Sequence, residues 1–325
     1  MSVLVTGGAG YIGSHMTYAL LDRGEKVVVL DNLSTGNRSL VGEKAMLVEG
    51  EAGDQGLVRK LVADHAIDAA IHFAGSIVVP DSVADPLAYY GNNTVASRAL
   101  IEACVEGGVK NFIFSSTATV YDADTTQPLA EDAPKNPISP YARSKLMTEW
   151  MLEDASRAHD FRYAVLRYFN VAGADPQGRT GQSSPRATHL IKRAAQAALG
   201  RVPHLDIFGT DYPTRDGTGV RDYIHVSDLV DAHLLALDAL RGGARSSTFN
   251  CGYGHGASVR EVIGMVEQVI GRKLPVREGP RRAGDPPELI ADPARIKATL
   301  GWQPRHDDLA GIVRSALDWE RRFNR

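Results

Sequence analysis

The chain has 325 residues, of which 43% are hydrophobic and 23% charged, and its formal net charge is −3. A chain of this length can bury a large core, and its slightly acidic balance argues against nucleic acid or an anionic membrane as the main partner. Its two cysteines exclude a disulfide framework. We find no basic start followed by a long apolar core and no apolar run of membrane-spanning length, so we expect a cytoplasmic protein without a membrane partner.

The N-terminal segment predicts a strand, a glycine-rich turn, a helix and a second strand. Residues 3–6 and 27–31 are short apolar runs, and the apolar residues between Ile12 and Leu20 keep helical spacing up to Gly24. The turn between the first strand and the helix carries glycines at 7, 8, 10 and 13, which match the dinucleotide fingerprint. A helix that begins at such a turn presents its N–H groups and positive dipole end to phosphates. The segment therefore predicts a dinucleotide site.

Asp31 ends the second predicted strand and favours NAD over NADP. A carboxylate at this distance from the glycines accepts hydrogen bonds from the adenosine ribose hydroxyls. No lysine or arginine follows until Arg38, so nothing close by would hold a 2′-phosphate. The alternative is that Asp31 is an ordinary strand-end turn residue, but the upstream glycines favour the ribose.

Strand-like and helix-like runs alternate up to Asn170, which predicts a doubly wound parallel α/β sheet of the Rossmann type. Ligands of such sheets bind beyond the carboxyl ends of the strands. We therefore expect the chemistry in the loops after Phe73, Ser115 and Phe169. The predicted strands are 45–49, 69–73, 111–115 and 163–169, and the predicted helices are 55–64, 86–106 and 140–159.

The second half of the chain is less regular. It predicts helices at 188–200, 227–240, 258–270 and 307–323, separated by short strand-like pieces. We expect an NAD-binding domain at 1–169 and a smaller α/β substrate-binding lobe at 170–325, with some segments crossing back. The ten histidines show no metal-ligand spacing, so we expect no metal site.

Tyr141 and Lys145 are the candidate catalytic pair. They follow Pro140, which suits the start of a helix, and a spacing of four residues places both side chains on one helical face. A tyrosine of pKa about 10 is a poor base, but a lysine and a positively charged nicotinamide nearby would favour its phenolate. Hydroxyls at 115–117 could orient a substrate hydroxyl. The alternative is that Tyr141 and Lys145 lie on a solvent-exposed helix face without a catalytic role. The glycine turn earlier in the chain favours the catalytic role.

Motifs along the whole chain resemble the extended short-chain dehydrogenase/reductase family and, within it, the UDP-galactose 4-epimerases. The segment from Asp216 to Val226 and the arginine pair followed by Gly284-Asp285 are the most specific matches. The other matching segments are residues 6–15, 71–75, 112–121, 139–141, 144–146 and 166–170.

The resemblance implies reversible 4-epimerisation of a UDP-hexose through a 4-keto intermediate with tightly bound NAD, in a homodimer. It implies that Tyr141 removes the proton of the 4-hydroxyl while hydride passes from C4 to the nicotinamide. Thr117 would bind that hydroxyl, and Lys145 would hold the nicotinamide ribose. By resemblance, the cofactor contacts are Gly7, Gly10, Tyr11, Ile12, Gly13, Asp31, Asn32, Glu51, Ala52, Phe73, Ala74, Gly75, Asn92, Ser115, Tyr141, Lys145 and Phe169.

The resemblance also implies a site for the UDP-sugar, and it leaves the sugar open. Leu289 falls where relatives carry a residue that limits sugar size, so a UDP-N-acetylhexosamine or a UDP-pentose remains an alternative. The implied substrate contacts are Thr117, Tyr141, Asn170, His189, Phe208, Arg221, Arg282, Asp285 and Leu289.

Some residues depart from the family pattern or bear on rival functions. Ile77 stands where relatives often have a lysine, and Glu51 where they have an aspartate, so one contact to NAD could be lost. A nucleotide-sugar dehydratase would carry two acidic residues at positions 118 and 119, where this chain has Ala118 and Thr119. Neither of these residues can protonate the leaving hydroxyl or remove the C5 proton. A reductase or dehydrogenase that exchanges its cofactor with solvent also stays open as an alternative function. A non-catalytic NAD-binding regulator would be expected to lose the Tyr/Lys pair.

Overall fold

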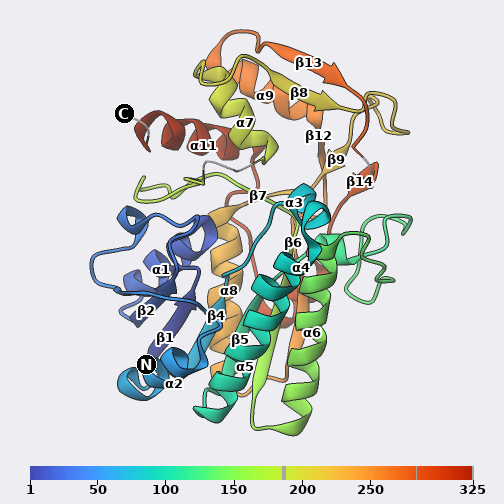
Figure 1. The fold of residues 1–325 in the computed structure, drawn as a ribbon. Helices are drawn as coiled ribbons and strands as arrows, with labels where there is room; N and C mark the ends of the chain where they lie inside the picture. Colours follow the sequence, from blue (N-terminus) through green and yellow to red (C-terminus); the bar gives the residue numbers. More distant parts are fainter. Residues whose placement is uncertain (185–187, 283, 324–325) are drawn as a thin grey trace. The chain divides into compact units, whose positions relative to one another are not determined.

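The computed structural model describes residues 1–184, 188–282 and 284–323 (Figure 1). Its contacts divide the chain into two compact units, and neither unit is a continuous stretch of sequence. The first contains residues 1–120, 137–167 and 230–249, and the second contains 121–136, 168–229 and 250–325. Within the described residues, no helix is long and apolar enough to cross a membrane.

A seven-stranded sheet in the order β11-β6-β5-β4-β1-β2-β3 organises the first unit (Figure 1). The pairings from β5 to β3 are parallel, which confirms the predicted Rossmann-type sheet. The chain runs from β1 outward to β3 and then returns to β4 on the other side of β1, so the topological switch point lies between β1 and β4. The strands are Ser2–Thr6 (β1), Lys26–Asp31 (β2), Met46–Glu49 (β3), Ala69–His72 (β4), Asn111–Thr117 (β5), Arg162–Tyr168 (β6) and Ser247–Cys251 (β11).

Helices cover both faces of this sheet. Figure 1 shows α2, α5 and α6 on one face and α1 and α8 on the other. Apolar residues of α2 and α5 pack on β1 and β5 in one core cluster that includes Leu4, Leu61, Leu100 and Phe112. The helix bounds are Tyr11–Asp22 (α1), Gln55–His65 (α2), Ala96–Glu106 (α5), Pro140–Ala158 (α6) and Val226–Arg241 (α8).

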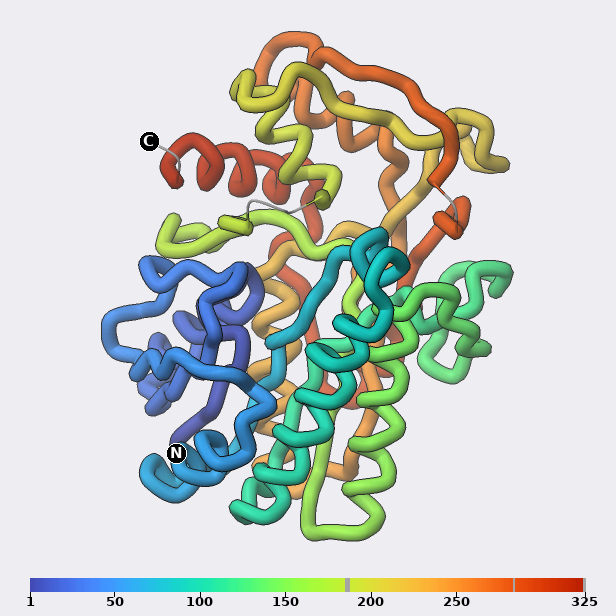
Figure 2. The backbone as a smooth tube through the Cα atoms, viewed as in Figure 1, coloured from blue at the N-terminus to red at the C-terminus, as the bar shows by residue number. Residues whose placement is uncertain are grey.

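The helix predicted at 86–106 differs from the observed one. It begins as a short α-helix at Pro86–Tyr89 (α4), continues as a π-helical turn at Tyr90–Val95 (η2), and becomes regular only in α5. Figure 2 shows α5 running beside α6, and η2 also packs on α6. π-Turns are rare, and they occur frequently at functional sites.

In its described residues, the second unit contains three small sheets and a group of helices. Helices α7, α9 and α11 pack on one another, and β8 and β13 form a parallel pair beside them. Among the described residues, its helices are Leu190–Ala198 (α7), Val259–Ile270 (α9), Ala294–Leu300 (α10) and Leu309–Phe323 (α11); its strand pairs are Asn170–Ala172 (β7) with Tyr223–His225 (β10), Leu205–Phe208 (β8) with Val276–Gly279 (β13), and Val220–Arg221 (β9) between Ala257–Ser258 (β12) and Glu288–Leu289 (β14).

A buried group of charges joins α7 to α11. The carboxylate of Glu320 is 1% exposed and accepts from Lys192 at 2.5 Å and from Arg201 at 2.7 Å. Lys192 also donates to the carbonyl of Gln182 at 2.8 Å. The two cations compensate the charge of the buried carboxylate. Removing any one of the three groups would leave a buried charge without its partner, which would destabilise the fold.

We predict that Glu320→Ala destabilises the protein by about 3–5 kcal/mol, because Lys192 would then be buried without its carboxylate. Asp318→Ala is the matched control on the same helix, since its ion pair with Arg321 is open to solvent and should contribute less than about 1 kcal/mol. Thermal unfolding of the two variants beside the wild type measures the difference. Equal midpoints for the two variants would contradict the prediction.

Candidate active site

The glycine-rich turn lies at the carboxyl end of β1, and its shape depends on missing side chains. Gly7 has a φ of +71°, and a Cβ there would lie 2.6 Å from the amide nitrogen of Ala74 in the loop after β4. A Cβ on Gly13 would lie 2.2 Å from the carbonyl oxygen of Gly7. Gly10 is the N-cap of α1 and brings no side-chain cap, and the first turn of that helix has no acidic residue. Phosphate groups therefore meet a bare, positively polarised helix start beside Tyr11.

Asp31 is fixed at the end of β2 beside this turn. Its carboxylate is buried and accepts from the backbone N–H of Ala9 at 2.9 Å and of Leu33 at 2.8 Å. A carboxylate has about four acceptor positions, so two remain for other donors. The neighbouring Asn32 donates to Glu51 at 3.2 Å, so the longer side chain of Glu51 reaches the rim of the same site.

The loop after β4 is held by Asn93, which the sequence analysis did not select. The side chain of Asn93 accepts from the N–H of Ser76 at 2.8 Å and donates to its carbonyl at 3.0 Å. It also donates to the hydroxyl of Ser144 on α6 at 3.1 Å. Asn92 donates to the Ser76 hydroxyl at 2.8 Å. Both asparagines lie in η2, so this turn links the loop of Phe73, Ala74 and Gly75 to α6.

The candidate catalytic residues lie together where β5 ends and α6 begins. Ser139 caps α6 by accepting from the N–H of Ala142 at 3.2 Å. Lys145 is buried, and its ammonium donates to the carbonyl of Ser115 at 2.9 Å. The hydroxyl of Thr117 lies close enough to the phenol of Tyr141 to lower its pKa. The structure thus brings together a hydroxyl pair and an ammonium, which is the arrangement that proton transfer to or from a substrate hydroxyl requires.

Burial controls the ionisation of this pair more than their mutual interaction does. Burial raises the pKa of Tyr141 to about 12, against the lowering effect of the Thr117 hydroxyl. Burial lowers the pKa of Lys145 to about 8. The expected lowering of the Tyr141 pKa by Lys145 together with a positively charged nicotinamide stays a prediction. The ammonium of Lys145 is held by its bond to Ser115 and lies 4.9 Å from the centre of the Phe114 ring.

Two histidines at the ends of strands, His72 and His225, are buried. His72 is 2% exposed, and its ring nitrogens contact the hydroxyls of Thr6 at 2.6 Å and Ser97 at 2.8 Å. Burial, reinforced by Lys145, lowers the pKa of His72 to about 3, so it stays neutral at physiological pH. His225 is equally buried.

Within the second unit, the predicted substrate residues form two neighbouring groups. The guanidinium carbon of Arg282 lies 3.9 Å from the centre of the Phe208 ring at the end of β8. Arg221 on β9 lies 3.5 Å from the carboxylate of Asp285, and the strand pairing places Leu289 opposite it.

Asn170, Phe169 and His189 lie near the start of β7. The N–H of Asn170 donates to the carbonyl of Asp222, next to Arg221, at 2.9 Å. The N–H of Phe169 donates to the carbonyl of Cys251 at 3.3 Å. His189 precedes α7 and is hydrogen-bonded to the backbone of Val171.

Comparison with known proteins identifies the family. The model of the NAD dependent epimerase/dehydratase family matches residues 3–252. The chain belongs to this family. A UDP-glucose 4-epimerase of Azospirillum brasilense is 59% identical over 319 residues, which are 98% of this chain and 92% of that protein. The predicted membership of the extended short-chain dehydrogenase/reductases is thereby confirmed.

Comparison with solved structures leads to the same family. UDP-glucose 4-epimerase from Brucella ovis in complex with NAD is 44% identical, with a TM-score of 0.94 over 98% of this chain and 97% of that one. The enzyme from Bifidobacterium longum in complex with NAD+ and UDP is 35% identical, with a TM-score of 0.93 over 99% and 98%.

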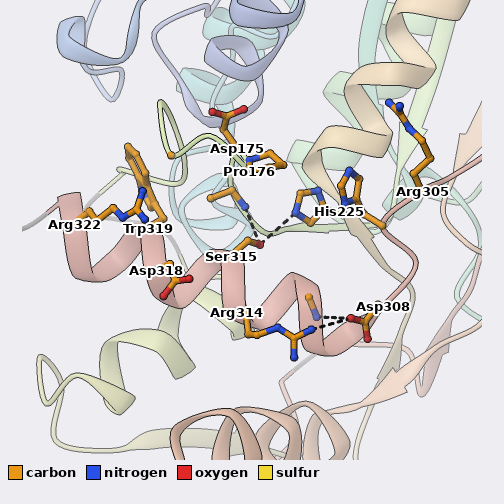
Figure 3. A pocket seen from close by; sticks show the side chains of 14 residues that line it. Asp175, Pro176, His225, Arg305, Asp308, Arg314, Ser315, Asp318, Trp319 and Arg322 are labelled. Carbon is orange, nitrogen blue, oxygen red and sulfur yellow. Dashed lines mark hydrogen bonds and ion pairs between the residues drawn. The ribbon is translucent and has the colours of Figure 1, made fainter.

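This epimerase/dehydratase chain also has a cavity of about 430 Å³ in the second unit, and His225 is among the residues that line it. It lies between the loop at 174–178, the segment at 305–308 and helix α11 (Figure 3). The guanidinium groups of Arg305, Arg314 and Arg322 point to different sides of it, so they do not converge on one ligand (Figure 3). Among the described residues, no group of three or more histidine, cysteine or acidic side chains could hold a metal ion.

Burial of Lys145 gives this family member a testable dependence of stability on pH. Its pKa is about 8 when folded against 10.5 in the free side chain. The charged side chain therefore destabilises the fold fully below pH 8, and this cost disappears as the pH rises to 10.5. In protein freed of nucleotide, Lys145→Met should be more stable than the wild type at pH 7, by up to roughly 3 kcal/mol, and the gap should close by pH 10.5. Thermal midpoints across this pH range test it, and a gap independent of pH would contradict it.

Proposed function

We propose that the chain catalyses the reversible 4-epimerisation of a UDP-hexose, interconverting UDP-galactose and UDP-glucose with NAD retained between turnovers. The observation that carries the proposal is the cluster of Thr117, Tyr141 and Lys145 at the carboxyl end of β5, in the same unit as the glycine turn and Asp31. The UDP-glucose 4-epimerases that match this chain over nearly their whole length support it.

NAD fits the residues at the carboxyl edge of the sheet. The turn leaves a cradle that a Cβ at Gly7 or Gly13 would fill, and Asp31 has acceptor positions for the ribose hydroxyls. When bound, NAD takes up and returns the hydride of the sugar C4. We propose that the residues holding it are Gly7, Gly10, Tyr11, Ile12, Gly13, Asp31, Asn32, Glu51, Ala52, Phe73, Ala74, Gly75, Asn92, Ser115, Tyr141, Lys145 and Phe169.

Tyr141 handles the proton of the sugar 4-hydroxyl, with Thr117 as its partner. With a pKa of about 12, the phenol of Tyr141 keeps its proton at neutral pH unless positive charge is brought near it. The ammonium of Lys145, held by the carbonyl of Ser115, provides such a charge one helical turn away. Thr117 orients the sugar hydroxyl against the same phenol, so the proton moves along one short hydrogen bond.

The UDP moiety suits the residues of the second unit. Planar guanidinium groups bind diphosphate oxygens in fixed geometry, and Arg221 and Arg282 are set in place by Asp285 and by the Phe208 ring. We propose that Thr117 and Tyr141 contact the sugar together with Leu289, and that the remaining UDP-sugar contacts are Asn170, His189, Phe208, Arg221, Arg282 and Asp285.

The positions of Ala118 and Thr119 disfavour a dehydratase. Ala118 is buried, and the hydroxyl of Thr119 lies 3.0 Å from that of Thr117. Neither side chain can protonate a leaving hydroxyl or remove a carbon-bound proton. The hydroxyl pair instead orients Thr117, which supports epimerisation.

Tyr141→Phe should lower kcat for conversion of UDP-galactose to UDP-glucose by about 10²–10⁴-fold, because it removes the proton-transferring hydroxyl. The assay contains no added NAD, and UDP-N-acetylgalactosamine is run in parallel to read what Leu289 permits. Tyr163→Phe, in a half-buried position on β6, is the matched control and should keep wild-type turnover. Acid release of nucleotide should show equal NAD content in all three proteins. Turnover that survives in Tyr141→Phe, or a wild type inactive on both sugars, would overturn the assignment.

We further propose that the protein works in the cytoplasm as a homodimer. Large apolar side chains are exposed on neighbouring helices of the first unit, including Leu87 at 78% on α4 and Trp150 at 54% on α6. Val83 and Val95 add to them, and η2 and α4 pack on α6. Exposed large apolar side chains on helices that pack together are typical of an interface, and these helices can pair with the same helices of a second copy.

Trp150→Glu should shift the protein from dimer to monomer, because a carboxylate would be buried at the interface. Met46→Glu is the control, since Met46 is similarly exposed, at 49%, but lies on the edge strand β3. Sedimentation equilibrium measures the mass of each. A monomeric wild type, or a Trp150→Glu variant that remains dimeric, would contradict the proposal.

A further inference from the structure

Three consecutive residues at the end of β5 interact with three residues of α6. The carbonyl of Ser115 accepts from Lys145 at 2.9 Å, the hydroxyl of Ser116 donates to the carboxylate of Glu149, and the hydroxyl of Thr117 acts on the phenol of Tyr141 by lowering its pKa. The two outer interactions belong to the proposed chemistry. The one from Ser116 to Glu149 does not, although it is buried.

The spacing of these interactions on α6 gives the Glu149 bond a specific effect. Positions 141, 145 and 149 lie four residues apart, so they share one face of the helix and span about 12 Å along its axis. Two interactions near one end would leave the helix free to tilt about them. A bond at the far end of the row fixes both the rotation and the axial position of α6 against β5.

Glu149 is itself rigidly held. Arg167 on β6 donates to Glu149 Oε1 at 3.0 Å and to Oε2 at 2.5 Å, and the two side chains are only 3% and 7% exposed. A two-point bond of this kind fixes the orientation as well as the distance of a carboxylate. The Ser116 hydroxyl therefore meets an acceptor that cannot move away with the helix.

We propose that Glu149, braced by Arg167 and bonded to Ser116, is a positioning residue that sets Tyr141 and Lys145 against the end of β5. It touches neither substrate nor cofactor and acts through the helix. The inference rests on the proposed function. A buried ion pair alone does not imply such a role, because its cost of desolvation often cancels its stabilisation. The positioning role is inferred instead from the place of Glu149 on the same face of α6 as Tyr141 and Lys145, the two residues of the proposed chemistry.

Ser116→Ala is the sharpest test, since it removes the bond and leaves the Glu149–Arg167 pair intact. We expect kcat to fall by about 10–100-fold, because displacements below 1 Å suffice for such losses. KM for UDP-galactose should stay within about threefold, since the proposed UDP contacts are elsewhere. Glu149→Gln should give a similar loss. Glu153→Gln, one turn further along α6 in an exposed pair with Arg157, should behave as the wild type.

Two further readouts separate positioning from mere stability. In a double-mutant cycle, Ser116→Ala combined with Glu149→Gln should cost little more than either change alone, as expected for two partners of one bond. The Tyr141 phenol, followed as the ultraviolet difference between each NAD-loaded protein and its Tyr141→Phe counterpart, should titrate at higher pH in Ser116→Ala, because the pKa-lowering effect of the Thr117 hydroxyl is weakened.

The outcomes are distinct. Additive losses, or unchanged kcat and tyrosine titration in Ser116→Ala, would overturn the positioning role even if the thermal midpoint falls. A wild type without epimerase activity would refute the proposed function instead. In that case the tyrosine titration still decides the positioning role, because it needs no turnover.

Discussion

The parallel pairing of β1 with β2 and β4 is the constraint on which the site depends. Parallel strands bring all their carboxyl ends to one edge of a sheet, so Thr6, Asp31 and Thr117 end up at the same edge although they are far apart in the chain. The reversal of strand order between β1 and β4 opens a crevice there. The absence of a Cβ at Gly7 lets the glycine turn approach the loop after β4. A single methyl group at Gly7 would separate two of the segments that we propose hold the dinucleotide.

Burial, rather than direct charge pairing, sets the electrostatics at this edge. The same cause raises the pKa of Tyr141 and lowers those of Lys145 and His72. Each shift favours the neutral form of its group, as desolvation must. A site built in this way responds strongly when a charge enters, because little solvent screens it. Positive charge near Tyr141 therefore has a much larger effect on its proton than it would have at the surface.

Local pattern was sufficient for most of the fold and for the core of the candidate site. Apolar runs and helical spacing predicted the strands and helices of the first unit to within a few residues, because buried parallel strands and amphipathic helices leave strong signals. The glycine turn, Asp31 and the Tyr141–Lys145 pair could be predicted for the same reason, since each lies within one short segment.

Features that depend on contacts between distant segments could not be predicted. The π-turn in the predicted helix 86–106 leaves no periodic signal, and Asn93 matters only because that turn aims it at Ser76 and Ser144. Two adjacent asparagines in the middle of a helical pattern were the available hint, since asparagine is a poor helix former. The bond from the Lys145 ammonium to the carbonyl of Ser115 was not predictable for the same reason. A spacing of four residues places two side chains on one face, but only the strand beneath decides where the ammonium points.

The departures from the family pattern show how one contact can be replaced by another. Glu51 stands where a shorter carboxylate is common, and its extra methylene lets it accept from Asn32 beside Asp31. That contact holds Asn32, and with it the end of β2, in place at the ribose edge of the site. Ile77, by contrast, is 49% exposed and brings no polar atom to its position. Glu51 therefore keeps a carboxylate at the rim of the site, whereas Ile77 leaves the rim without the cation that relatives often have at that position. We therefore propose that Asp31 and the amides at the start of α1 contribute most to binding NAD, because they are fixed by backbone geometry and do not depend on a long side chain at the rim.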